Sequence, residues 1–233
     1  MNEPDWIDVV VARRWDEALD VVCLELVPAT ESALPRFEAG AHIDVLTPGG
    51  HLRPYSLCNP AAERHRYVIA VLRERRGRGG SISLHDDVKV GDRLRILAPR
   101  NEFGLATSAV HSVLLAGGIG VAPLLCMADS LWLRGASFEL HYSARHAGRA
   151  AFADAIQRQP WASRVRLHWS ERMGHLNVTS LLRGAPALSH VYACGPQAFI
   201  GGAVAAFVNS GRAMDRLHLE WFSTQRESRT MSA

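Results

Sequence analysis

The order of apolar and polar positions divides the chain into two parts with different rhythms. Up to about residue 100, short runs rich in Val, Ile and Leu alternate with turns that contain Gly, Pro or Asp. This pattern predicts closely spaced strands and therefore a small antiparallel β-barrel or sandwich. One short helix is predicted at 81–88. The strands are predicted at 6–15, 20–29, 40–57 (two short strands around a Pro-Gly-Gly turn), 66–74 and 91–100.

After Asn101 the chain alternates between strands and helices. The apolar stretch 111–135 predicts a buried strand, a glycine-rich turn and a helix with proline near its start. This alternation predicts a doubly wound parallel α/β sheet. Further strands are predicted at 138–145, 164–171, 190–195 and 217–222, and helices at 148–159, 177–184 and 196–211. We place one domain at 1–103, a second at 104–222, and a polar, flexible tail or linker at 223–233.

Composition and charge exclude several classes of function. The formal net charge of +3 is too small to predict a nucleic-acid partner. The chain has no run of 18 apolar residues and no secretion signal at its start, so we expect no membrane span and a cytoplasmic location. The histidines lack metal-binding spacing, and no metal is assigned. The cysteines are too scattered to hold an iron–sulfur cluster and suit a reducing compartment: Cys23, Cys58, Cys126 and Cys194.

Two glycine-rich turns are candidate phosphate sites. In "LLAGGIGVAPLL", Gly117, Gly118 and Gly120 let a strand turn tightly into a helix, whose free N–H groups and positive dipole end favour a pyrophosphate. The G-G-x-G spacing differs from the usual dinucleotide motif, and a turn without ligand is the alternative. In "RGRGGSISLH", Gly79 and Gly80 precede Ser81 at a predicted helix start. A second anion cradle and a loop with a capping serine are both possible there.

Two further stretches carry candidate chemistry. "YACGPQAFI" ends a strand at Cys194-Gly195-Pro196, and ligands of open α/β sheets lie beyond the carboxyl ends of strands. Cys194 at such a strand end would face the cleft, whereas a buried structural thiol is the commoner state of a lone cysteine. "HLRPYSLCNP" contains Arg53, Tyr55 and Ser56 almost in succession. It is either a polar turn or a segment that directs three side chains at one ligand.

Taken in order, "RPYSL", "GRGGS", "GGIGVAP", "CGP" and "EWF" resemble the ferredoxin–NADP reductase superfamily. Within it the chain is most similar to reductases of the phthalate dioxygenase reductase and vanillate demethylase reductase type. The resemblance covers about residues 5–222. It implies an FMN-binding β-barrel followed by a nicotinamide-binding α/β domain.

For the flavin, the resemblance implies that Arg53 meets the phosphate, Tyr55 lies along the isoalloxazine and Ser56 forms a hydrogen bond near N5. Gly79, Gly80 and Ser81 match the family's phosphate loop. The closeness of this loop to the flavin motif, without a separate segment for an adenine half, favours FMN over FAD.

For the nicotinamide, the resemblance implies a pyridine-nucleotide loop and a segment beside the reacting ring. Glu220 and Phe222 match an end that lies over the flavin, and Trp221 between them is either functional or core. Ser56, Cys194 and Glu220 are the candidate catalytic residues. The resemblance favours NADH, although Ser143 and Arg145 leave NADPH possible. The residues that match the pyridine-nucleotide loop are Gly117, Gly118 and Gly120, and those that match the segment beside the nicotinamide ring are Cys194, Gly195 and Pro196.

The resemblance also implies an acceptor. The family usually continues into a [2Fe–2S] domain, whereas this chain ends about ten residues after "EWF". We expect the acceptor to be either a separate iron–sulfur protein or a missing C-terminal domain, and the function to be the reductase component of a Rieske-type oxygenase or demethylase. Two alternatives are a reductase of free flavin or ferric complexes and a non-catalytic nucleotide-binding module.

Overall fold

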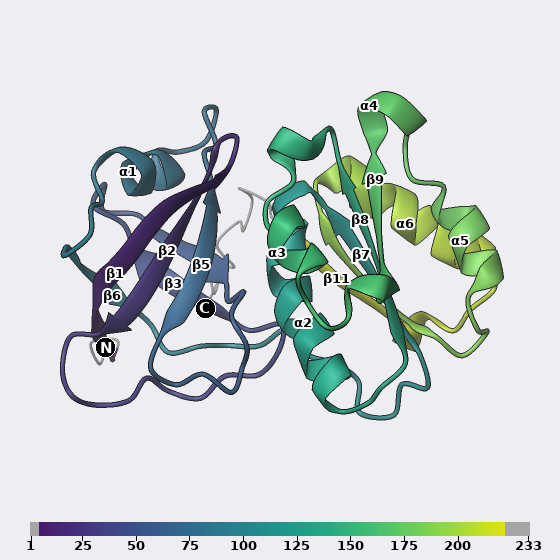
Figure 1. Cartoon of the computed structure of the whole chain (residues 1–233), viewed down its shortest axis with the longest axis horizontal. Coiled ribbons are helices and arrows are strands. Elements are labelled where there is room, and N and C mark those ends of the chain that lie inside the picture. Colours follow the sequence, from purple (N-terminus) through teal and green to yellow (C-terminus); the bar gives the residue numbers. More distant parts are fainter. Residues whose placement is uncertain (1–4, 222–233) are drawn as a thin grey trace, which may run out of the picture.

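The computed structural model describes residues 5–221 and shows two lobes side by side, each built on its own sheet (Figure 1). The first lobe holds six antiparallel strands in the order β4-β3-β6-β1-β2-β5. Its elements are β1 (Ile7–Ala18), β2 (Val21–Pro28), β3 (His42–Leu46), β4 (Leu52–Ser56), β5 (Tyr67–Leu72), α1 (Gly80–Asp86) and β6 (Arg93–Ile96). A bridge between Leu57, just after β4, and Ile69 of β5 joins the two edges of the sheet. The sheet is therefore curled into the predicted barrel.

The second lobe holds five parallel strands in the order β11-β10-β7-β8-β9. The strands are β7 (Ser112–Gly117), β8 (Phe138–Ala144), β9 (Val165–Trp169), β10 (His190–Gly195) and β11 (Leu217–Trp221). The helices are α2 (Val121–Leu133), α3 (Ala153–Gln157), α4 (Ser170–Met173), α5 (Val178–Gly184) and α6 (Gln197–Asn209), and the short 3₁₀ turns are η1 (Gly118–Gly120), η2 (Ala147–Arg149), η3 (Ala162–Arg164) and η4 (Met214–Arg216). This is the doubly wound α/β sheet that the alternating pattern predicts.

The apolar core explains how the two lobes are joined. Buried residues of the barrel and of the face of the parallel sheet covered by α2 form one continuous cluster. A separate, smaller cluster lies on the opposite face, under α5 and α6. The helices α2 and α3 therefore lie between the parallel sheet and the barrel, as Figure 1 shows. Burial of apolar surface between the lobes favours a fixed arrangement over independent domains.

Two predicted elements differ from the structure. The helix expected at 148–159 is reduced to Ala153–Gln157, because Phe152 adopts a left-handed φ of 64° that interrupts the turn. The strand expected at 164–171 ends at Trp169, and α4 follows it. Phe222 and the expected tail at 223–233 lie outside the described residues. No helix in the described part of the chain is long and apolar enough to cross a membrane.

Candidate functional site

Arg53 and Tyr55 lie on β4, an edge strand of the barrel sheet. Proline is compatible with such a position, because an edge strand does not need every N–H group for the ladder. Pro54 lies opposite Asp44 of β3 in the antiparallel register. The stretch is thus a strand rather than a polar turn. Arg53 and Tyr55, two residues apart, project on the same side of it.

The phosphate-loop glycines lie directly against Arg53. A Cβ atom on Gly80 would approach the Arg53 side chain to 2.9 Å at Cγ and 3.2 Å at Nε. Gly79 has a left-handed φ of 88°, and Ser83 donates its backbone N–H to the Gly79 carbonyl at 2.9 Å. The Ser81 hydroxyl accepts the Glu74 N–H at 3.0 Å and closes the loop between β5 and α1. The fold therefore brings together Arg53 and the Gly-Gly-Ser turn, which are separated in sequence.

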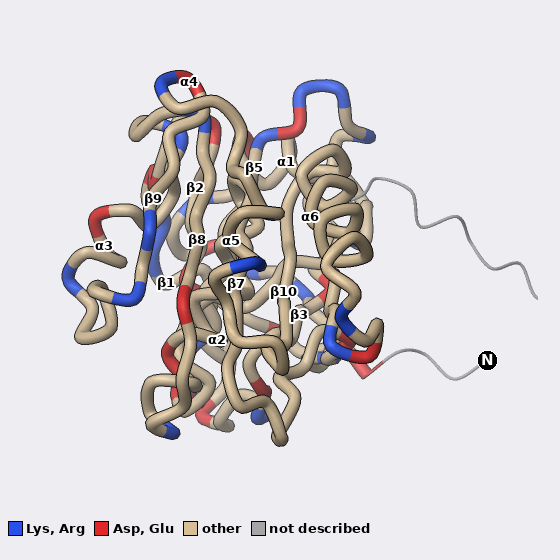
Figure 2. The backbone as a smooth tube through the Cα atoms, turned by 90° about the vertical axis from the view of Figure 1, so that its right-hand side faces the viewer, with Lys and Arg blue, Asp and Glu red and all other residues tan. Residues whose placement is uncertain are grey.

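The surroundings of this turn are strongly basic. The loop at 73–78 contains four arginines and is the blue segment beside the α1 label in Figure 2. Arg73 pairs with Asp86 at 2.6 Å, and Arg75 pairs with Asp20 at 3.1 Å. A guanidinium beside glycine-rich backbone at the start of a helix is chemistry that suits one phosphate group. The residues present therefore fit the phosphate of a flavin mononucleotide.

The glycines of the second turn allow two strand ends to pack against each other. A Cβ atom on Gly120 would lie 2.1 Å from the Cys194 carbonyl oxygen, and one on Gly117 would lie 2.8 Å from the Phe199 ring. Gly118 is different, because its φ of 55° requires glycine while the space beside it is open. Hence Gly117 and Gly120 have a packing role, and Gly118 presents accessible backbone at the start of α2. That combination fits close approach of a dinucleotide.

The two lobes meet at a cluster of three side chains. The Ser56 hydroxyl of β4 donates to Glu220 Oε2 at 3.2 Å, and the Cys194 thiol of β10 lies 3.8 Å from the same oxygen. Cys194 and Glu220 are opposite each other in the parallel pairing of β10 with β11. The structure therefore brings together the three residues that the sequence nominates for catalysis.

Burial determines the protonation states in this cluster. Desolvation raises the pKa of Glu220 to about 7, Glu102 adds to the rise, and the hydrogen bonds from Ser56 and Cys194 oppose it. Burial likewise raises the pKa of the Cys194 thiol well above its ordinary value, and the neighbouring Glu220 carboxylate acts in the same direction. At neutral pH the cluster thus holds a neutral thiol beside a carboxyl that readily gains or loses a proton.

The comparisons with known proteins agree with this geometry. No family model matches the chain. It is 46% identical over 218 residues to a vanillate O-demethylase oxidoreductase of Pseudomonas putida, covering 93% of this chain and 69% of that protein. It is 41% identical over 202 residues to the phthalate dioxygenase reductase of Burkholderia cepacia, covering 85% and 63%. Among solved structures, phthalate dioxygenase reductase superimposes with a TM-score of 0.88 at 38% identity, covering 94% of this chain and 68% of that one.

The chain belongs to the phthalate dioxygenase reductase and vanillate demethylase reductase family. Members of this family are flavin-dependent NAD(P)H oxidoreductases that pass electrons to iron–sulfur centres. The recognised resemblance, the fold and the enzyme class are thereby confirmed. The chain spans about two thirds of the length of these relatives.

For two residues of this reductase the sequence leaves alternatives open, and their burial bears on the choice. Cys194 does not lie open to the cleft, because its side chain is fully buried and directed at Glu220. Trp221 is not a core residue, since 47% of it is exposed. In the described part of the reductase, no group of three or more His, Cys, Asp or Glu side chains is placed to hold a metal ion.

Two residues around the site were not nominated from the sequence. His51 lies beside the phosphate loop, with its Nε2 3.4 Å from the position of a Cβ atom on Gly79. Glu102 influences Glu220 from the segment that connects the lobes. Neither residue belongs to a motif. The only signal for His51 is its place two residues before Arg53, and Glu102 is revealed only by the folded structure.

Proposed function

We propose that this protein is an NADH-dependent FMN oxidoreductase that passes single electrons to an iron–sulfur protein, as the reductase component of a Rieske-type oxygenase or demethylase. The observation that carries the proposal is the contact of Ser56 with Glu220, whose Oε2 atom the Cys194 thiol also approaches. It joins the strand with the flavin motif to the strand ends where a nicotinamide would bind. A donor and an acceptor cofactor held by the two lobes would therefore meet at this cluster.

FMN is the proposed flavin because the barrel offers one phosphate cradle next to the flavin strand. Arg53, Gly79, Gly80 and Ser81 would hold the phosphate, and the half-buried Tyr55 would lie along the ring system. We assign residues 1–103 to this flavin domain and 104–222 to the nucleotide domain. When bound, the flavin supplies the capacity to accept a hydride and to release electrons one at a time.

For the pyridine nucleotide, Gly118 and the start of α2 would hold the pyrophosphate, while Cys194, Gly195 and Pro196 would flank the nicotinamide. Phe222 matches, with Glu220, the end that would lie over the flavin. NADH is favoured over NADPH by an ion pair. Arg145 Nε lies 3.7 Å from Glu171 Oε1, and the Glu171 N–H donates to the Arg145 carbonyl at 3.1 Å. The Glu171 carboxylate competes with a 2′-phosphate for Arg145, which would lower the affinity for NADPH relative to NADH.

Within the cluster of Ser56, Cys194 and Glu220, a proton can be passed between the Glu220 carboxyl and the Ser56 hydroxyl. The Ser56 hydroxyl can turn from Glu220 toward a ligand, and the Glu220 carboxyl can restore a proton that the hydroxyl gives up. Because the pKa of Glu220 is about 7, both directions of this transfer are accessible near neutral pH. The buried thiol of Cys194 remains neutral and provides shape and a weak hydrogen bond rather than a nucleophile.

The proposed partner is a [2Fe–2S] protein or domain together with an oxygenase component. Electron transfer to [2Fe–2S] acceptors is typical of the family, and the solved phthalate dioxygenase reductase is described as a modular structure for that transfer. We also propose a cytoplasmic location, since all four cysteines are free and buried, which suits a reducing compartment.

Anaerobic addition of NADH to the purified protein tests the proposal. The flavin released on denaturation should be FMN, one per chain, and its visible absorption band should bleach with NADH and more slowly with NADPH. Reoxidation by a plant-type ferredoxin, followed at the iron–sulfur absorption, should then occur. A protein that retains no flavin, or whose flavin neither nucleotide reduces, would show that the proposed function is wrong. Turnover of free flavin without retained FMN would favour the free-flavin reductase instead.

A further inference from the structure

A second polar contact joins the lobes at the tip of the β1–β2 hairpin. In both lobes it involves a different segment of the chain from the Ser56–Glu220 contact. Glu17 Oε1 accepts the backbone N–H of Phe152 at 2.8 Å, and the Leu19 N–H donates to the Gly148 carbonyl at 2.8 Å. Glu17 is itself held in place, because its other oxygen accepts the indole N–H of Trp15 at 2.7 Å. One half-buried carboxylate thus connects the barrel to the entry of α3.

An ion pair extends this contact. Asp20, the turn residue of the hairpin, accepts Arg149 of η2 at 3.4 Å. We call Glu17, Leu19 and Asp20, with their partners Gly148, Arg149 and Phe152, the hairpin clamp. All three partners lie on the segment that leads from β8 into α3.

Backbone conformation also singles out this contact. Within residues 5–221, the non-glycine residues with positive φ are Asp20 at 63° and Phe152 at 64°, and they lie on opposite sides of the clamp. Asp tolerates this region, but for a bulky aromatic residue it is strained. Such a conformation persists only where the surroundings hold it in place. The hydrogen bond from the Phe152 N–H to Glu17 is one of the interactions that hold it.

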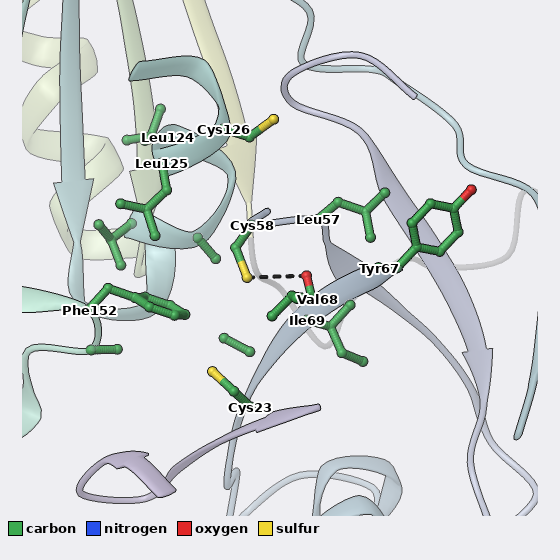
Figure 3. Packing of buried hydrophobic residues seen from close by; sticks show 14 of the residues in the cluster. Cys23, Leu57, Cys58, Tyr67, Val68, Ile69, Leu124, Leu125, Cys126 and Phe152 are labelled. Atoms are coloured by element: carbon green, nitrogen blue, oxygen red, sulfur yellow. Dashed lines mark hydrogen bonds between the residues drawn. The ribbon is translucent and has the colours of Figure 1, made fainter. Parts of the chain in front are cut away.

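Behind the clamp the contact is formed by buried apolar side chains. The Phe152 side chain is buried in the shared core cluster, and Figure 3 shows its ring directed toward Cys58 and Cys23 of the barrel and lying near Leu125 of α2. The Cys58 thiol donates to the Val68 carbonyl at 3.1 Å and is therefore also fixed. An apolar contact alone lets two surfaces slide, whereas a directional hydrogen bond at its edge sets one register.

We infer that Glu17 is a positioning residue for hydride transfer: by binding the Phe152 N–H it sets the angle between the lobes and hence the approach of the two cofactors. The inference rests on the proposed function, because it concerns the distance between a nicotinamide held by one lobe and a flavin held by the other. Transfer between cofactors depends steeply on this distance, and a misplacement of about 1 Å can cost roughly 100-fold in rate. Glu17 accepts hydrogen bonds from Trp15 and Phe152, and neither of these residues belongs to a proposed cofactor cradle.

The test compares Glu17→Ala with Glu17→Gln, which keeps an oxygen acceptor for the Phe152 N–H. Asp16→Ala, an exposed carboxylate next to Glu17 on the same strand, is the matched control. Anaerobic stopped-flow measures the limiting rate of FMN reduction and the NADH dissociation constant. We expect Glu17→Ala to slow the limiting rate about 10- to 100-fold while NADH and FMN affinities change less than threefold. Glu17→Gln should recover most of the rate, and Asp16→Ala should match the parent protein.

A second readout does not depend on turnover. Amide hydrogen exchange of the flavin-free protein should show faster exchange at Phe152 and Leu19 in Glu17→Ala, with protection in β7 unchanged. If Glu17→Ala exchanges faster there but reduces FMN at the parental rate, or loses rate only in proportion to unfolded protein, the inference is wrong. Should Glu17→Ala not fold, Arg149→Gln, which breaks only the ion pair, must still slow FMN reduction. Failure of the parent protein to bleach would instead refute the proposed function.

Discussion

The Glu220 carboxyl should make the stability of the flavin-free protein fall as the pH rises. Its pKa is raised by burial from an ordinary 4.5 to about 7, so the folded state binds a proton that the unfolded state has already released. A raised pKa contributes its full stability below pH 4.5 and loses it through pH 7. The linkage relation gives a loss of about 2.5 kcal/mol in the free energy of unfolding between pH 5 and pH 8 from this one group.

Urea unfolding followed by tryptophan fluorescence at pH 5, 6, 7 and 8 measures this loss. Glu220→Gln has no proton to release but keeps an oxygen that can accept the Ser56 hydroxyl. Relative to the parent protein it should therefore gain about 2.5 kcal/mol over the same range. Glu171→Gln, which changes an exposed carboxylate in the same lobe, is the control and should follow the parental pH profile. A difference between Glu220→Gln and the parent that does not vary with pH would refute the reasoning, because the carboxyl would then not be desolvated.

Four further substitutions test the site and the fold around it. Arg53→Ala should make FMN dissociate more readily while the circular dichroism of the α/β lobe stays unchanged, and unchanged FMN content after dialysis would contradict its role at the phosphate. Gly120→Ala should lower the free energy of unfolding by roughly 3 kcal/mol, since its Cβ would lie 2.1 Å from a carbonyl oxygen. Gly202→Ala, on an open face of α6, should instead raise it by roughly 0.5–1 kcal/mol in the same urea titration. Glu171→Gln should raise the kcat/KM for NADPH relative to NADH, and an unchanged ratio would show that this carboxylate does not select the nucleotide.

The local patterns of the sequence predicted the kinds and order of elements well. Alternating strands and helices after residue 101 follow directly from hydrophobic runs and turn residues, and the glycine turns at 79–80 and 117–120 lie where strands or loops feed helices. The short α3 could not be anticipated. The run from Gly148 to Gln157 has helical composition, but Phe152 is drawn into the interface with the barrel, and tertiary packing overrides the local preference there.

The sequence predicted less well how the site residues lie relative to one another. Ser56 and Glu220 are 164 residues apart, and Glu17 and Phe152 are 135 apart, so no periodicity or spacing links them. The resemblance nominated Ser56 and Glu220 through their motifs. Glu17 belongs to no motif, and its role depends on a backbone N–H that the sequence does not display. Contacts of this kind become visible only when both lobes are in place.

The phosphate cradles alone do not specify the enzyme. Each cradle is local, since Gly80 lies against Arg53 and Gly118 opens the turn into α2. Two local cradles would bind two nucleotides on independently moving lobes without bringing them together. That freedom is removed by the common core cluster and by two carboxylates that bind across the lobes. Glu220 accepts a hydrogen bond from Ser56, and Glu17 of the hairpin accepts one from Phe152. An electron-transfer function therefore depends as much on how the lobes are joined as on either binding motif, and the most informative mutations are those in the joint.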